Sequence, residues 1–223
     1  ILTKLTFIIS MLFLAYTIGD FCLKKFKNNN FSILTKTTLG LCIIPYIVFL
    51  MGIFNILSEQ SIIVLHISIC IMGIANRQLT NDLSKKIKEL IKLSFNNGFQ
   101  IFCICFLIIQ GLIYLLMSFT PPIGIDDLMY HFYFPKLYLK NNFIDYFPDT
   151  LLSAIPQHME MLWTWCIAIN SVESAQLLNW VLGYFVCLWI YKVSSELIFN
   201  KRIGLIAVTF FYSISSVGPV LYT

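Results

Sequence analysis

The residues best suited to chemistry gather in one segment of the chain, between positions 126 and 160. Two adjacent aspartates, Asp126 and Asp127, are followed by His131, Lys136 and Glu160. A carboxylate can act as a general base toward a hydroxyl or an amine. A lysine ammonium can stabilise the charge that develops on a leaving phosphate. The segment therefore contains the residue types that a group-transfer reaction needs.

Each of these residues also has a purely structural interpretation. Aspartate is favoured at helix N-caps, so the two aspartates could cap a helix, and Lys136 could extend its ammonium to lipid headgroups. Glu160 is either a second active-site acid or the polar start of a Trp-rich helix. His131 and His158 could bind a metal, but the chain has no HxxxH spacing and ordinary interfacial histidines are favoured. Metal dependence stays open.

Composition places this segment in a membrane protein. Of 223 residues, 58% are hydrophobic and 12% are charged, and the mean hydropathy is +0.81. A soluble domain of this size cannot bury so much apolar surface, so lipid must be the main solvent. The net charge of +4 comes from short basic clusters between apolar runs, without the features of a nucleic-acid-binding module. We expect an all-α fold, a polytopic transmembrane helical bundle.

Apolar runs predict six membrane spans, each near the roughly 20 residues that cross a bilayer. They are residues 5–23, 37–57, 62–79, 99–119, 175–191 and 203–221. A further run, 159–169, has 11 residues and is expected on the outer face as an interfacial or re-entrant helix. The Trp and Tyr side chains are expected to form an interfacial belt. His66, alone in an apolar span, is expected to be satisfied within the bundle.

The basic residues predict which side each connection faces, because basic loops stay in the cytoplasm. If connections 24–36, 76–98 and 192–202 are cytoplasmic, 12 of the 15 basic residues lie inside. The loop 120–174 is then outside. Apolar residues at helical spacing between Leu83 and Phe95 predict an amphipathic helix on the cytoplasmic leaflet. We divide the chain into leading spans, 1–98, and a core, 99–223, that carries the outer loop.

Local signals suggest how the outer loop presents its acids. Pro121 and Pro122 should end the fourth span, and Gly124 should give the backbone freedom to turn. From Asp126 a juxtamembrane amphipathic helix is predicted, which would stack each aspartate on the residue four positions later. Pro135 should kink or restart that helix. The carboxylates would then lie at headgroup depth.

The loop resembles the first large outer loop of GT-C membrane glycosyltransferases, the superfamily of protein O-mannosyltransferases and aminoarabinose transferases of lipid A. The matching motifs are Asp126-Asp127-Leu128-x-Tyr130-His131, Pro135-Lys136-Leu137-Tyr138, Pro156 with Glu160-Met161-Leu162, Asn200-Lys201-Arg202, and Gly204-Leu205-Ile206-Ala207 before Ser216-x-x-Pro219. They lie in order over residues 100–223. Residues 37–79 resemble extra leading spans of some bacterial members.

The resemblance implies a sugar transferase that uses a polyprenyl-phosphate-linked donor and a lipid, glycan or protein acceptor. By analogy Asp126 is the general base and Asp127 its alternate. Lys136 or a residue beyond the chain end receives the phosphate, and His131 and Glu160 are further substrate-binding residues. Some relatives require a divalent metal. The implied location is a bacterial inner membrane, with the loop outside.

Two further expectations accompany this resemblance. Relatives have more spans and later active-site residues, and the chain runs from Ile1 to Thr223, so we expect an N-terminal portion of a longer enzyme. The alternative function is a transporter, or a non-catalytic membrane subunit whose acidic loop binds a partner. A transporter would favour charged residues inside the spans, and these are scarce.

Overall fold

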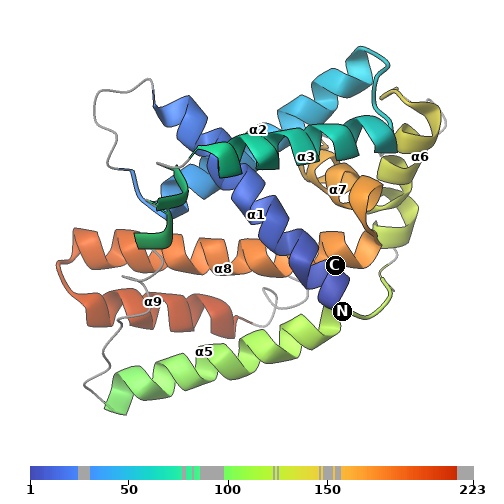
Figure 1. Ribbon diagram of the computed structural model, residues 1–223. Coiled ribbons are helices and arrows are strands. Elements are labelled where there is room, and N and C mark those ends of the chain that lie inside the picture. Colours follow the sequence, from blue (N-terminus) through green and yellow to red (C-terminus); the bar gives the residue numbers. More distant parts are fainter. Residues whose placement is uncertain are drawn as a thin grey trace. The chain divides into compact units, whose positions relative to one another are not determined.

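The computed structural model describes residues 1–24, 31–76, 79–81, 83–85, 98–122, 124, 126–145, 147, 153 and 157–214. Within these ranges the fold is helical and contains no strand. The elements are α1 (Leu2–Leu23), α2 (Ile33–Ile53), α3 (Glu59–Ala75), α5 (Gly98–Met117), η1 (Asp127–His131), α6 (Tyr133–Asn141), α7 (His158–Ile169), α8 (Val172–Leu197) and α9 (Lys201–Ser213) (Figure 1). The prediction of an all-α fold is confirmed.

Four of the described helices, α1, α2, α5 and α8, are long and apolar enough to cross a membrane. A fifth span results if α3 is counted together with the short helix Leu79–Lys85. These helices indicate a membrane protein. The last part of the predicted span 203–221 and most of the predicted cytoplasmic amphipathic helix lie outside the described residues.

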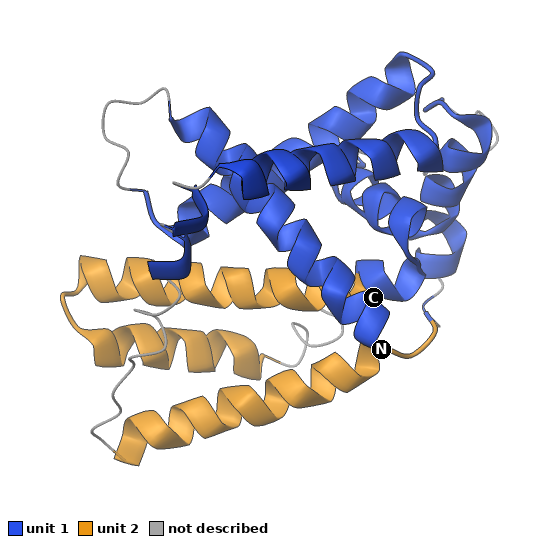
Figure 2. Ribbon diagram, viewed as in Figure 1, with its two compact units in different colours: residues 1–85, 122–175 blue, residues 86–121, 176–223 orange. Residues whose placement is uncertain are grey.

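The chain forms two compact units, and each contains two separate stretches of sequence (Figure 2). Unit 1 comprises residues 1–85 and 122–175, and unit 2 comprises 86–121 and 176–223. The helices of the outer loop, η1, α6 and α7, therefore share a unit with α1 to α3. The division into leading spans, 1–98, and a core, 99–223, stays a prediction.

Helices α1 and α2 of unit 1 cross at two glycines. A Cβ on Gly19 would lie 1.8 Å from the carbonyl oxygen of Lys36, and one on Gly40 would lie 1.8 Å from that of Ala15. No other residue fits at either position. Small residues at such crossings let two backbones approach closely, as is common between helices in membranes.

A buried ion pair lies beside this crossing. Lys36 Nζ is 2.7 Å from Asp20 Oδ1, and the two side chains are 7% and 10% exposed. Lys24 lies 3.3 Å from the other carboxylate oxygen and is more exposed. The connection was expected to extend to residue 36, but α2 already begins at Ile33 and includes Lys36.

Helix α7 is buried within unit 1, and most of its side chains are covered by protein. It packs on α2, α3 and α6. Trp163 and Trp165 are both buried, so the expectation that these two belong to an interfacial belt is wrong. His66 of α3 bonds to Trp165 and to Ser10 of α1, which confirms the expectation that its ring is satisfied within the bundle.

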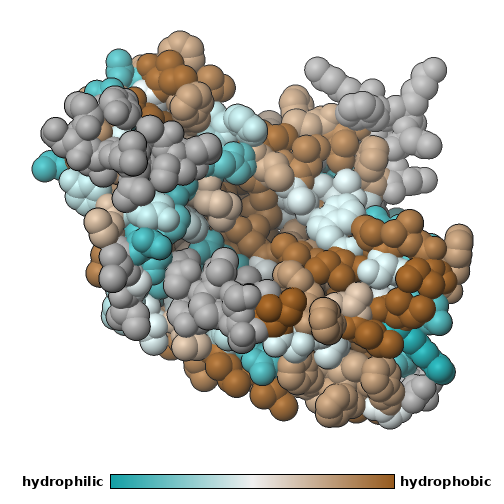
Figure 3. Space-filling view, turned by 180° about the vertical axis from the view of Figure 1, so that it is seen from behind, coloured by the Kyte–Doolittle hydropathy of each residue, from teal (hydrophilic) through white to brown (hydrophobic). Residues whose placement is uncertain are grey.

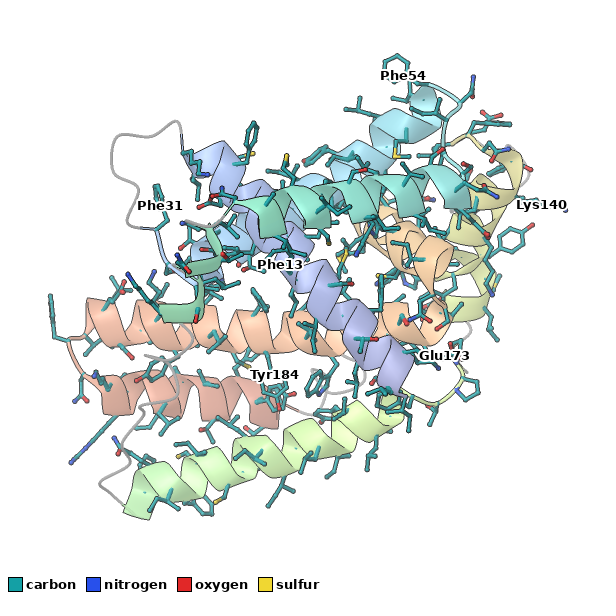
Figure 4. The ribbon with its side chains drawn as sticks, viewed as in Figure 1. Phe13, Phe31, Phe54, Lys140, Glu173 and Tyr184 are labelled. Carbon is teal, nitrogen blue, oxygen red and sulfur yellow. The ribbon has the colours of Figure 1, made fainter. Side chains whose placement is uncertain are left out.

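Unit 2 is held by close packing of α5, α8 and α9. Tyr184 extends from α8, and its hydroxyl occupies the space where Gly111 of α5 has no side chain (Figure 4). The Trp180 indole donates a 2.9 Å hydrogen bond to the Gly111 carbonyl. Tyr212 of α9 packs edge-on against Tyr114.

Many large apolar side chains remain on the surface of both units. Figure 3 shows broad hydrophobic areas on one face, with smaller hydrophilic areas between them. Such areas would be unfavourable in water, and lipid is the solvent that suits them.

Candidate functional site

The aspartate pair lies at the start of a π-helical turn. In η1 the Phe132 amide donates to the carbonyl of Asp127, five residues earlier, at 3.0 Å. Single π-turns are rare and occur often at functional sites. The chain then restarts as α6 at Tyr133, with Pro135 in the first turn, where its missing N–H costs nothing. The predicted restart at Pro135 is present, but the predicted α-helix from Asp126 is a wider turn.

Asp126 precedes η1 and its side chain is exposed. It makes no capping hydrogen bond to the turn that follows. The capping interpretation is therefore wrong for this residue, and its carboxylate is accessible to a substrate.

Asp127 has the opposite environment. Asp127 is 2% exposed, and no side chain within the described ranges donates a hydrogen bond to its carboxylate oxygens. Burial raises the pKa of this carboxyl above its usual value; the Asp126 charge adds to the shift, while His131 and the Gly124 amide oppose it. Burial of a carboxylate that no side chain satisfies is costly.

Gly124 makes this burial possible. A Cβ at position 124 would lie 2.6 Å from Asp127 Oδ2, so a larger residue would displace the carboxylate. The described glycines have no positive φ angle. The expected role of Gly124, backbone freedom, is therefore replaced by the provision of space.

His131 and Glu160 form an ion-pair geometry that joins η1 to α7. His131 Nδ1 lies 2.7 Å from Glu160 Oε1, and the Glu160 side chain is buried. The His131 ring lies edge-on to Trp163, with ring centres 5.0 Å apart. Because Nδ1 donates to the carboxylate, Nε2 is the atom that faces other partners. Both predicted residues are thus brought together.

Tyr130 lies close to both the exposed acid, Asp126, and the buried acids, Asp127 and Glu160. Burial raises the pKa of its phenol, and the nearby carboxylates of Asp126 and Glu160 raise it further. The Tyr130 ring also lies 3.9 Å from the His131 ring, centre to centre. The structure therefore collects Asp126, Asp127, His131 and Glu160 around this tyrosine.

Lys136 is not part of this cluster by direct contact. Its side chain is exposed on α6 and forms no ion pair with the described acids. Lys140, one turn later, is also exposed and points away from the neighbouring helices (Figure 4). Among the described residues no group of three His, Cys, Asp or Glu side chains is placed to hold a metal.

Two residues that sequence reasoning did not select join α6 to α7. The Tyr138 hydroxyl donates a hydrogen bond to Gln157 Oε1. Burial, with a contribution from Glu160, raises the pKa of Tyr138 to about 12, so the phenol stays a donor at neutral pH. The only sequence signal was that Tyr138 falls within the Pro135-Lys136-Leu137-Tyr138 motif.

A cavity of about 590 Å³ lies between α2, α6 and α7. It too was missed, because its walls come from segments about 100 positions apart. Its described lining is Pro45, Tyr46, Phe49, Ile53, Tyr138, Ile144, Asp145, Ser153, Gln157, His158 and Met161.

Comparison of the chain with protein-family models, with curated proteins and with solved structures found no match. The functional argument therefore depends on the residues of the outer loop and their geometry.

Proposed function

We propose that this chain is a membrane glycosyltransferase, or the N-terminal portion of one, which transfers a sugar from a polyprenyl-phosphate-linked donor to a lipid, glycan or protein acceptor. One observation carries the proposal. The exposed, uncapped carboxylate of Asp126 lies at a π-helical turn beside a second acid that is buried at evident cost. Folding alone gains nothing from that cost, and costly polar burial is typical of functional sites.

In the proposed reaction Asp126 is the general base. It accepts the proton of the acceptor hydroxyl or amine as that atom forms a bond to the anomeric carbon of the sugar. The bond from this carbon to the phosphate oxygen breaks, and the lipid phosphate leaves with the electron pair. His131, held by Glu160, presents Nε2 to the substrate, and Lys136 approaches the phosphate from the exposed face of α6.

The proposal includes six spans and an outer loop, 120–174, on the external side of a bacterial inner membrane. Contacts within unit 1 support this topology. The Leu57 amide, between α2 and α3, donates to the Asn142 carbonyl, and Lys4 pairs with Glu173. All four residues belong to segments assigned outside or to the outer ends of spans. Asp20 and Lys24, assigned near the inner face, pair with each other.

The test is sugar transfer by the full-length protein in membranes. Asp126→Asn should reduce transfer by at least about a hundredfold, the size expected for a lost general base, without loss of membrane expression. Glu59→Gln, an exposed acid at the start of α3, is the matched control and should retain activity. Full activity of the Asp126 variant would reject it as the base. Absence of transfer by the wild-type protein would favour the non-catalytic subunit.

A further inference from the structure

Helix α6 has one buried face and one open face. The helix packs on α7 and η1. Its exposed residues, Tyr133, Lys136 and Lys140, recur at spacings of three and four positions and therefore share one face. Lys140 points away from the neighbouring helices (Figure 4). The buried residues, on the opposite face, are Phe134, Pro135, Tyr138 and Leu139.

The open face begins with large apolar side chains and ends with lysines. Leu128, Met129 and Tyr133 are 60%, 58% and 50% exposed. They are followed by Lys136 and Lys140, and we call these five residues the α6 surface. Neighbouring apolar and basic side chains are typical of segments that lie at the boundary between hydrocarbon and lipid head groups.

The two lysines of the α6 surface carry charge that no described acid neutralises. Neither Lys136 nor Lys140 forms an ion pair within the part of the chain that the structure describes. The only acid between positions 127 and 141 is Asp127, which is buried. The complement of this surface is therefore an anion joined to an apolar group.

A hydrogen bond within unit 1 places the end of α6 beside the end of a candidate membrane span. Helix α2 ends at Ile53, and the amide of Leu57, four residues later, donates to the Asn142 carbonyl at 3.2 Å. The end of a span marks the boundary between hydrocarbon and head groups. Lys140, two residues before Asn142, therefore lies at head-group depth.

We propose that the α6 surface binds an anionic phospholipid of the adjacent leaflet. Lys136 and Lys140 contact its phosphate, and the apolar residues contact the start of its acyl chains. Head-group depth and the apolar part of the surface favour a lipid over an acidic protein. The proposal does not rest on the proposed function, and Lys140, which the proposed reaction does not use, tests it separately.

Lipid titration of the full-length protein in a neutral detergent is the first test. Native mass spectrometry should show that the tightest-bound phosphatidylglycerol binds at least roughly tenfold more strongly than phosphatidylcholine, because only the former has a net negative charge. Equal affinities for the two lipids would overturn the proposal.

Charge-removal variants locate the bound lipid. Lys140→Gln should weaken phosphatidylglycerol binding roughly fivefold, and Lys136→Gln with Lys140→Gln roughly twentyfold, since each lysine near an anionic lipid contributes about a factor of five. The matched control, Lys201→Gln with Arg202→Gln, removes the same charge from exposed positions of unit 2 and should change the affinity less than about twofold. Equal weakening by the two double variants would show that only net charge matters and would overturn the proposal.

A photoreactive benzophenone amino acid in place of Tyr133 identifies the occupant in native membranes. Mass spectrometry of the cross-linked protein should find phospholipid on the peptide that contains position 133. A protein adduct there, or no adduct, would reject lipid as the occupant.

Discussion

The indole Nε1 of Trp165 donates a hydrogen bond to Nδ1 of His66, at 3.1 Å, across 99 positions of sequence. An indole N–H can only donate, so Nδ1 is unprotonated and His66 carries its proton on Nε2. That proton faces Ser10 Oγ at 3.1 Å, and Ser10 in turn donates to the Phe7 carbonyl at 2.7 Å. The donor and the acceptor of each of these three hydrogen bonds are therefore fixed. Together the three bonds join α1, α3 and α7.

Loss of the indole donor should weaken unit 1. Trp165→Phe leaves a buried imidazole nitrogen without a partner, which costs about 1–3 kcal/mol, and the smaller ring adds a cavity cost. Thermal unfolding in detergent should show a clearly lowered Tm. Trp189→Phe, a half-buried tryptophan of unit 2, is the control and should have a smaller effect. Equal loss in the two variants would contradict a specific role for the His66 contact.

Asp127→Asn should stabilise the protein at neutral pH. Burial raises the pKa of Asp127 above its ordinary value of 3.8, so the native state binds its proton more tightly than the unfolded chain does. Ionisation therefore destabilises the fold as pH rises above 3.8, by about 1.4 kcal/mol for each unit by which the pKa is raised. The variant should raise Tm at pH 7 and have little effect near pH 3.5. A gain of equal size at both pH values would show that ionisation is not the cause.

Removal of one partner of the buried ion pair should strongly destabilise the protein. Lys36→Met leaves Asp20 buried without its closest counter-charge, which costs about 3–5 kcal/mol. Lys24→Met removes the more exposed partner of the same carboxylate and should cost less than about 1 kcal/mol. The double variant Asp20→Leu with Lys36→Met should recover much of the lost stability. Similar unfolding temperatures for the Lys36 and Lys24 variants would argue against burial as the source of the difference.

Gly19→Val should prevent the close approach of α1 and α2, because even a Cβ there overlaps the Lys36 carbonyl oxygen. We expect little folded protein, measured by size-exclusion chromatography and resistance to proteolysis. Gly98→Ala is the matched control, since a Cβ at Gly98 meets nothing within 4 Å. A folded Gly19 variant would mean that the two helices can separate without loss of the unit.

Topology can be checked with reporters. A reporter fused after Asn142 should be detected outside, and one fused after Lys88 should be detected inside. Opposite results at both positions would invert the proposed orientation and place Asp126 in the cytoplasm.

Sequence patterns predicted the elements well where one physical signal decides the structure. The apolar run and the two prolines after it gave the end of α5 correctly, since its helix stops at Met117. A restart of the helix near Pro135 was also predicted correctly, although the turn before it is π-helical and not α-helical. His66 was correctly expected to have partners, because a polar ring in an apolar span must find them.

The sequence could not show whether an apolar helix faces lipid or is buried in protein, since both environments favour apolar residues. Helix α7 was therefore expected at the interface, although α2, α3 and α6 cover it. The different burial of Asp126 and Asp127 could not be predicted either, because two adjacent aspartates look alike in the sequence. Their environments differ because of the π-helical turn, which no sequence pattern indicated. The cavity depends on α2 meeting α6 and α7, and periodicity within one segment contains no such information.

Unit 1 consists of two separate stretches of sequence, so its parts are synthesised at different times. The ribosome completes α1 to α3 long before α7, and the 99 positions between His66 and Trp165 take roughly 5 to 20 s to translate. During that interval Ser10 and His66 lack the helix that will cover them. Water, lipid headgroups or an insertion factor must therefore form hydrogen bonds with their polar groups first. A defect in α7 would therefore be seen by the cell as a failure of helices that had already been inserted.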